Sequence, residues 1–410
     1  MGLIRSISST TWLRIALINF LLVGLLGLLM RLKMILPMPW INQKFLLHAH
    51  SHFAFTGWVT HALMVLVLVV VARQWNLTKK GQWLVLANIF TAYGMLVTFM
   101  IQGYALYSIT FSTLNILVSF FFAAYVWNLT KNQWFRMAVF LLVFSSIGTF
   151  FLSYLMVTHN LDSRKQLAAV YFYLHFQYNG WFLFACLGLL HSWLKSTGIT
   201  MRREKMLYTV TALASIPTYF LSVLWWKDMP TWLYVVVVVV TLAQLVAWFI
   251  WLIEFSRKFP VLNRTLSKLT AITLLVVGAA LSIKVVLQAL SLVPELSQLA
   301  YGYRPIVIGY LHLILLMVIS LFIVAYLIGN HVLRENRWVR IGMYVTISGI
   351  VLNELLLMVQ GLSGMLRVYV PYTAQGLAGA SVVICLGLLI VCCGQYQKKS
   401  PVSTGDYHSF

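Results

Sequence analysis

The amino-acid sequence predicts an all-α protein that crosses a bilayer about twelve times, and three observations support this. Apolar residues make up 61% of the 410 residues and charged residues only 9%, whereas a typical soluble domain has about 25% charged residues. The apolar residues fall in runs of about 20, which is the length that an α-helix needs to span a bilayer. Short connections separate these runs. Lipid is therefore expected to contact most of the exterior.

The predicted spans follow one another with little chain between them. The first begins at Trp12 after Arg5, and because no cleavage site follows it, we expect a retained helix and not a signal peptide. We expect one membrane domain over residues 1–395 and a polar cytoplasmic tail over 396–410. The predicted spans are 12–34, 45–73, 83–106, 108–128, 134–158, 166–194, 206–226, 231–254, 268–292, 304–329, 339–362 and 374–394.

The formal net charge of +21 is explained by cations in the connections between spans. No basic stripe interleaved with base-reading polar side chains is present, so nucleic-acid binding is not expected. If the N-terminus lies inside, 20 of the 29 lysines and arginines fall on the inner side and 8 on the outer side. The positive-inside rule therefore predicts that both termini are cytoplasmic.

The cysteines give no support to disulfides, thiolate metal sites or attached c-type haem, because none forms a Cys-x-x-Cys pair. They lie in apolar runs or at the end of the last one: Cys186, Cys385, Cys392 and Cys393.

Histidines recur at matched places in the second, sixth and tenth spans. The motif His-x-x-x-x-Gly-Trp begins at His52 and again at His175, and His312 takes the corresponding place in the tenth span. Each lies seven to nine residues from the outer end of its span, or about 12 Å deep at 1.5 Å per residue. A second motif, Met-x-Gln-Gly, begins at Met100 and at Met358. We therefore predict three repeats of four helices.

Ionisable side chains inside a membrane are costly, so these three histidines are candidate functional residues. Neutral imidazole suits both iron and copper, and the spacing does not choose between them. In the second span His48 and His52 share a helix face, whereas His50 points elsewhere. The repeat favours His52 as the ligand, and His50 remains the alternative.

Three further histidines are expected to serve in packing or hydrogen bonding, because they stand outside the repeat: His61, His191 and His331.

Twelve spans with histidines on the second, sixth and tenth resemble the catalytic subunit (subunit I) of haem–copper oxidases and nitric oxide reductases. The resemblance implies a low-spin b-type haem held by His52 (or His50) and His312. It makes His175 the counterpart of a ligand to copper or non-haem iron. It further implies electron transfer, or the chemistry or sensing of O₂ or NO, in a bacterial inner membrane. Other respiratory subunits and a cytochrome or quinol electron donor are the partners it implies.

The sequence departs from the family pattern at the second metal centre. The seventh span lacks the family's two adjacent histidines, Tyr310 stands where a histidine holds the high-spin haem, and Asn179 replaces a Tyr or Glu. We therefore expect copper and a second haem to be absent or weakly held. Glu354 is the only carboxylate well inside a span, and we expect Lys284 to extend to the outer end of its helix. Proton pumping is accordingly not expected.

Two other functions stay open at this point. One is a secondary transporter, a class in which twelve helices are common. The other is a haem-free structural or assembly subunit of a respiratory complex. Whether the protein is an enzyme also stays open.

Overall fold

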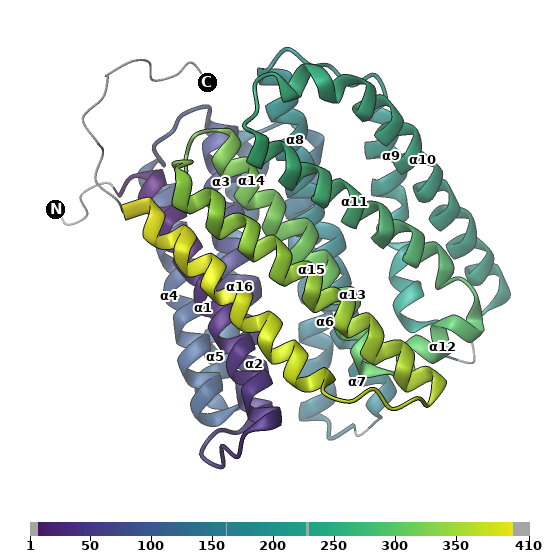
Figure 1. Ribbon diagram of the computed structural model, residues 1–410. Coiled ribbons are helices and arrows are strands. Elements are labelled where there is room, and N and C mark those ends of the chain that lie inside the picture. The colour runs from purple at the N-terminus through teal and green to yellow at the C-terminus, as the bar shows by residue number, and fades with distance from the viewer. Residues whose placement is uncertain (1–6, 161, 227–228, 397–410) are drawn as a thin grey trace. The chain divides into compact units, whose positions relative to one another are not determined.

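The computed structural model describes residues 7–160, 162–226 and 229–396 (Figure 1). These residues form helices and connections, with no strand among them. Eight predicted spans are single α-helices: α1 (Ser9–Ile35), α4 (Lys79–Gln102), α5 (Leu106–Leu129), α6 (Gln133–Val157), α10 (Thr231–Asn263), α11 (Lys268–Leu290), α15 (Arg337–Leu366) and α16 (Thr373–Tyr396).

Three predicted spans are composite helices with a π-helical middle. They are α2 (Gln43–Phe53) with η1 (Ala54–Thr60) and α3 (His61–Ala72); α7 (Ser163–His175) with η2 (Phe176–Phe182) and α8 (Leu183–Ser196); and α13 (Arg304–His312) with η4 (Leu313–Ser320) and α14 (Leu321–Gly329).

The seventh predicted span is a bent pair, α9 (Glu204–Ala214) and the 3-10 helix η3 (Pro217–Val223), with an angle of 51° between them. Proline cannot donate the hydrogen bond that continues an α-helix, which accounts for the break before Pro217. The short helix α12 (Pro294–Gly302) lies in the connection after α11.

In the described part of the chain, ten helices are long and apolar enough to cross a membrane, and the bent pair would make eleven. The sixth predicted span is helical from Ser163 to Ser196 but is not among these ten. Polar side chains such as Gln177 and Asn179 lower its hydropathy. All twelve predicted spans are thus helical, and the prediction of an all-α polytopic membrane protein is confirmed.

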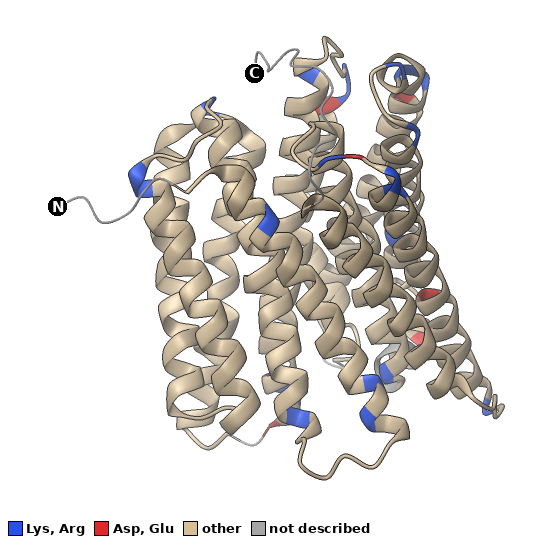
Figure 2. Cartoon of the chain, turned by 60° about the vertical axis from the view of Figure 1, so that its left-hand side comes forward, with Lys and Arg blue, Asp and Glu red and all other residues tan. Residues whose placement is uncertain are grey.

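The surface of the helices is apolar, as contact with lipid requires. Phe121 is 68% exposed and Leu106 is 73% exposed. Figure 2 shows Lys and Arg mostly near the ends of the helices. Because lipid supplies no hydrophobic drive between helices, close packing through small residues holds them together. In α15 a Cβ atom on Gly342 would lie 2.7 Å from the carbonyl oxygen of Gly387 in α16, so only glycine permits this approach.

The chain divides into two compact units, each described by itself. The first comprises residues up to Val118, Ile323–Leu356 and the chain from Pro371; the second comprises Ser119–Phe322 and Leu357–Val370. The predicted tail lies outside the described residues, apart from Tyr396 at the end of α16.

Each of the three histidine-bearing spans contains a π-helix directly beyond its histidine. The segment η1 begins two residues after His52, and η2 and η4 begin immediately after His175 and His312. π-Helical turns are rare and are concentrated at functional sites. The same irregularity at matched positions supports the threefold repeat read from the sequence.

Candidate functional site

In the first unit, His52 is held by an aromatic pocket at the end of α4. Its Nε2 atom lies 2.9 Å from the hydroxyl oxygen of Tyr104. Its ring stacks on Phe99, with centroids 4.3 Å apart and an interplanar angle of 16°. Tyr104 lies in the turn between α4 and α5, after Gly103 with its φ of 63°. Burial raises the pKa of Tyr104 to about 12, so the phenol stays protonated at neutral pH.

The other two histidines of α2 follow the predicted faces. The ring of His48 lies edge-on to Tyr104, with centroids 4.6 Å apart, so it shares the side of His52. Its Nε2 atom is buried and has no hydrogen-bond partner among the described residues. His50 instead packs on α1, where a Cβ atom on Gly27 would lie 3.2 Å from His50 Cε1. The predicted separation of His50 from the other two is confirmed.

In the second unit, His312 is oriented by its own helix. The helix α13 has a proline in its first turn, and Nδ1 of His312 lies 2.8 Å from the carbonyl oxygen of Ile308. Only a protonated Nδ1 can donate to that oxygen, so the lone pair of the neutral ring is on Nε2. A backbone carbonyl bound to one ring nitrogen is the usual support of a histidine whose other nitrogen ligates a metal.

His175 is engaged differently, because both its ring nitrogens are used within the protein. Nε2 donates to the carbonyl oxygen of Ser215 at 2.8 Å, and Nδ1 accepts from Asn179 Nδ2 at 3.2 Å. Ser215 lies at the break between α9 and η3, and apart from His175 its carbonyl oxygen accepts only a long contact of 3.5 Å from the Thr218 hydroxyl among the hydrogen bonds of the described residues. His175 therefore satisfies a backbone group that the break exposes. Pro217 is the sequence signal for this role.

Tyr310 and Tyr178 lie beside each other in the second unit, with ring centroids 6.4 Å apart in an edge-on arrangement. Tyr178 is also close to the ring of His175, at 6.4 Å. Nowhere in the described ranges do three or more His, Cys, Asp or Glu side chains gather in a way that could hold a metal ion.

The expectation for Lys284 is wrong. Its side chain is 1% exposed and does not extend to the helix end. Its Nζ atom donates to Gln288 Oε1 at 2.5 Å, and Gln288 Nε2 donates to Gln244 Oε1 at 3.0 Å. Gln288 lies four residues after Lys284 on the same helix, so this spacing in the sequence could have predicted the contact.

Glu354, the carboxylate predicted within a span, lies in the first unit. It accepts a hydrogen bond from Asn353 at 3.1 Å and interacts electrostatically with Arg31 of α1.

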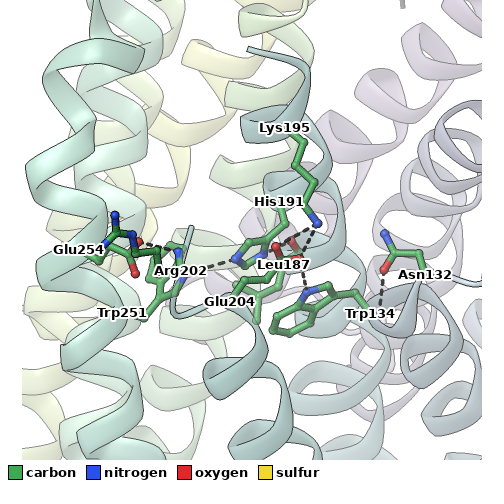
Figure 3. A network of polar contacts seen from close by, with 9 residues as sticks. All are labelled: Asn132, Trp134, Leu187, His191, Lys195, Arg202, Glu204, Trp251 and Glu254. Atoms are coloured by element: carbon green, nitrogen blue, oxygen red, sulfur yellow. Dashed lines mark hydrogen bonds and ion pairs between the residues drawn. The ribbon is translucent and has the colours of Figure 1, made fainter. Parts of the chain in front are cut away.

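A polar network in the second unit was not predicted from the sequence (Figure 3). His191 stacks on Trp134 with centroids 5.0 Å apart and accepts a hydrogen bond from Trp251 Nε1 at 3.2 Å. Glu204 accepts from Trp134 Nε1 and pairs with Lys195 at 2.9 Å. His191 is thus a packing and hydrogen-bonding residue, as predicted. The same holds for His61, which contacts the carbonyl oxygen of Trp12 at 3.1 Å.

A second carboxylate of this network accepts hydrogen bonds from backbone amides. Glu254 of α10 accepts from the amides of Arg202 and Arg203 at 2.6 and 2.9 Å, at the start of α9. These amides have no acceptor within their own helix, so the carboxylate acts as a cap supplied by a neighbouring helix.

Among known proteins, this chain shows similarity in structure but none that is detectable in sequence. No family model matches the sequence, and no curated protein matches it. Among solved structures, a haem–copper terminal oxidase, determined by cryo-electron microscopy as a dimer, matches with a TM-score of 0.63 and 15% sequence identity. The match covers 97% of this chain and 85% of the oxidase chain. The fold of this protein is therefore similar to that of a haem–copper oxidase chain.

Proposed function

We propose that this is a haem-binding membrane protein with one low-spin b-type haem, ligated by His52 or His50 and by His312. One observation carries the proposal: in a fold similar to a haem–copper oxidase chain, the three spans with the repeated histidines each change to a π-helix directly beyond a histidine. The proposed role is electron transfer, or the chemistry or sensing of O₂ or NO, in a bacterial inner membrane. Other respiratory subunits and a cytochrome or quinol donor would be its partners.

The residues present fit this haem to different degrees. His312 fits an axial ligand because its Nδ1 is bound to Ile308 and its Nε2 carries the lone pair. His52 fits only if Tyr104 gives up its hydrogen bond to Nε2. A haem bound in this way supplies one-electron transfer. The protein's part is to orient the imidazoles and, through its apolar surroundings, to keep water away.

The residues present do not fit copper at the sixth span. Both ring nitrogens of His175 are bound within the protein, and the seventh span offers no histidine. The proposed function therefore involves no second metal.

An absorption spectrum of purified protein tests the proposal. After reduction with dithionite, protein from haem-replete cells should show the sharp α-band of a six-coordinate b-type haem, because two imidazoles fill both axial positions. A colourless protein with an intact fold by circular dichroism would exclude the proposal.

The second candidate is a haem-free structural subunit, and one observation favours it. Nε2 of His52 and both ring nitrogens of His175 already have partners within the protein, which is how structural histidines are satisfied. The same spectrum distinguishes the candidates. The bent helix α9–η3 is a feature also found in transporters, but His175 satisfies its freed carbonyl without a substrate.

A further inference from the structure

The second unit contains an apolar cavity of about 60 Å³ between α8, α10, α11 and η4. Leu183 and Cys186 form one wall, Trp248 and Trp251 a second, and Val318 closes it. Both indole N–H groups are already used, since Trp248 donates to Ser282 and Trp251 to His191. No polar hydrogen of these rings is therefore left to bind water, and an apolar occupant is favoured.

The cavity has a partly exposed rim. Gly278, Leu252 and Phe255 line it and are only half-buried, whereas Trp251 and Val318 at its base are buried. A Cβ atom on Gly278 would meet no atom within 4 Å, so open space adjoins this glycine. Next to the rim on the same helices, Leu275 is 56% exposed. The opening thus lies on an apolar, lipid-facing surface.

Two cations lie in the connection where α10 ends and α11 begins. Arg264 and Lys268 are exposed, and neither is within ion-pair distance of a carboxylate in the described part of the chain. Lys268 begins α11, ten residues before Gly278. At 1.5 Å per residue these two positions are about 15 Å apart along the helix, within the reach of an acyl chain from its headgroup.

We propose that this cavity receives the end of one acyl chain of an anionic phospholipid, whose phosphate is bound by Arg264 and Lys268. By comparison with a 150 Å³ cavity that holds benzene, the space accommodates about two or three chain carbons. Basic residues at the ends of membrane helices bind anionic headgroups by charge. A lipid is favoured over a small apolar molecule because Lys268, which has no carboxylate partner among the described residues, lies about 15 Å along α11 from the opening, a separation that one acyl chain can span.

The test compares phosphatidylglycerol with phosphatidylcholine by native mass spectrometry of the purified full chain. The variants are Gly278→Leu, which fills the cavity, and the double variant Arg264→Gln/Lys268→Gln. The controls are Gly379→Leu, another glycine with open space around it, and Lys79→Gln/Lys80→Gln, an exposed cation pair in the first unit. Thermal unfolding checks that each variant is folded. Phosphatidylglycerol brominated near the chain ends quenches tryptophan fluorescence when a chain end lies beside Trp248.

The wild type should retain phosphatidylglycerol in preference to phosphatidylcholine. The double variant should bind phosphatidylglycerol about 25-fold more weakly, from about fivefold per charge. Gly278→Leu should lose the quenching and retain less phosphatidylglycerol, because the leucine side chain takes the open space beside Gly278 that the chain end would occupy. Equal retention of the two lipids by the wild type would overturn the proposal. So would unchanged quenching in Gly278→Leu, or xenon binding in the cavity with no lipid preference.

Discussion

A histidine ligates iron through a ring nitrogen that carries a lone pair, so the hydrogen bonds of each imidazole set its chemistry. At His312 the bond from Nδ1 to Ile308 fixes the tautomer that ligation through Nε2 requires. We predict that His312→Ala abolishes the low-spin spectrum of reduced protein. The control is His331→Asn, which changes a histidine outside the repeat and keeps a residue that tolerates its φ of 56°. A spectrum that persists in His312→Ala would assign the haem to other ligands.

The choice on α2 depends on Tyr104. If His52 is the ligand, the phenol competes with the iron for Nε2, and Tyr104→Phe removes that competition. One hydrogen bond contributes about 1 kcal/mol net, so Tyr104→Phe should bind haem about fivefold more tightly in a titration of haem-free protein. His52→Ala should abolish the low-spin band. If His50→Ala abolishes it and His52→Ala does not, His50 is the ligand, and Tyr104→Phe should then have no effect.

Lys284 shows how a buried cation is kept in a helix bundle. Its Nζ atom donates to the neutral amide of Gln288, and no carboxylate lies within ion-pair distance in the described residues. Burying a charge costs several kcal/mol, so an apolar side chain of similar volume is often neutral or stabilising. We predict that Lys284→Met leaves the unfolding midpoint unchanged or raises it, whereas Gln288→Leu lowers stability by about 1–3 kcal/mol. Denaturation in a detergent series measures both. Strong destabilisation by Lys284→Met would instead indicate a second partner.

At the scale of elements, the bent seventh span depends on a residue of the sixth. His175 donates to the carbonyl oxygen of Ser215, which the break before Pro217 leaves without a helical donor. His175→Ala should therefore lower the free energy of unfolding by about 1–3 kcal/mol, because it leaves this buried carbonyl only the long 3.5 Å contact from the Thr218 hydroxyl. Asn179→Ala should cost less, because it removes only a donor to Nδ1. If His175 were chiefly a metal ligand, its replacement would change the metal content and leave the stability of metal-free protein unaltered.

The positions of the elements could be read from the sequence, because lipid requires runs of about 20 apolar residues wherever a helix crosses. The faces of α2 also followed from helical periodicity, and His48 and His50 point apart as predicted. The full set of hydrogen bonds around Lys284 could not be predicted from the sequence. Gln244 belongs to another helix, and hydropathy does not show which helices contact each other. The π-helices likewise depend on packing, although their place beside the repeated histidines agrees with the repeat.

At the scale of the whole molecule, the fold is similar to a haem–copper oxidase chain, while the sequence lacks much of the ligand set that the resemblance implies. The match covers 97% of the chain at 15% identity, so the helices are arranged similarly although few residues are shared. Apolar surfaces and small-residue contacts suffice to hold such helices together. Metal ligands are not needed for these contacts, so the fold does not by itself require a metal centre.

The last prediction is that the oxygen-reducing centre of that family is absent or rebuilt here. Tight copper binding comes from several converging ligands, and the matched positions offer only His175, whose ring nitrogens are both hydrogen-bonded. The resemblance implies that Tyr310 takes the place of the family's high-spin haem ligand, and its ring lies edge-on to that of Tyr178. We therefore expect substoichiometric copper and no cytochrome oxidase turnover from this chain alone. Elemental analysis and an oxygen electrode measure these two quantities on the same preparation, with haem content as the internal control. One tightly held copper per chain together with oxygen consumption would contradict the prediction, and His175 would then have to exchange Ser215 or Asn179 for the metal.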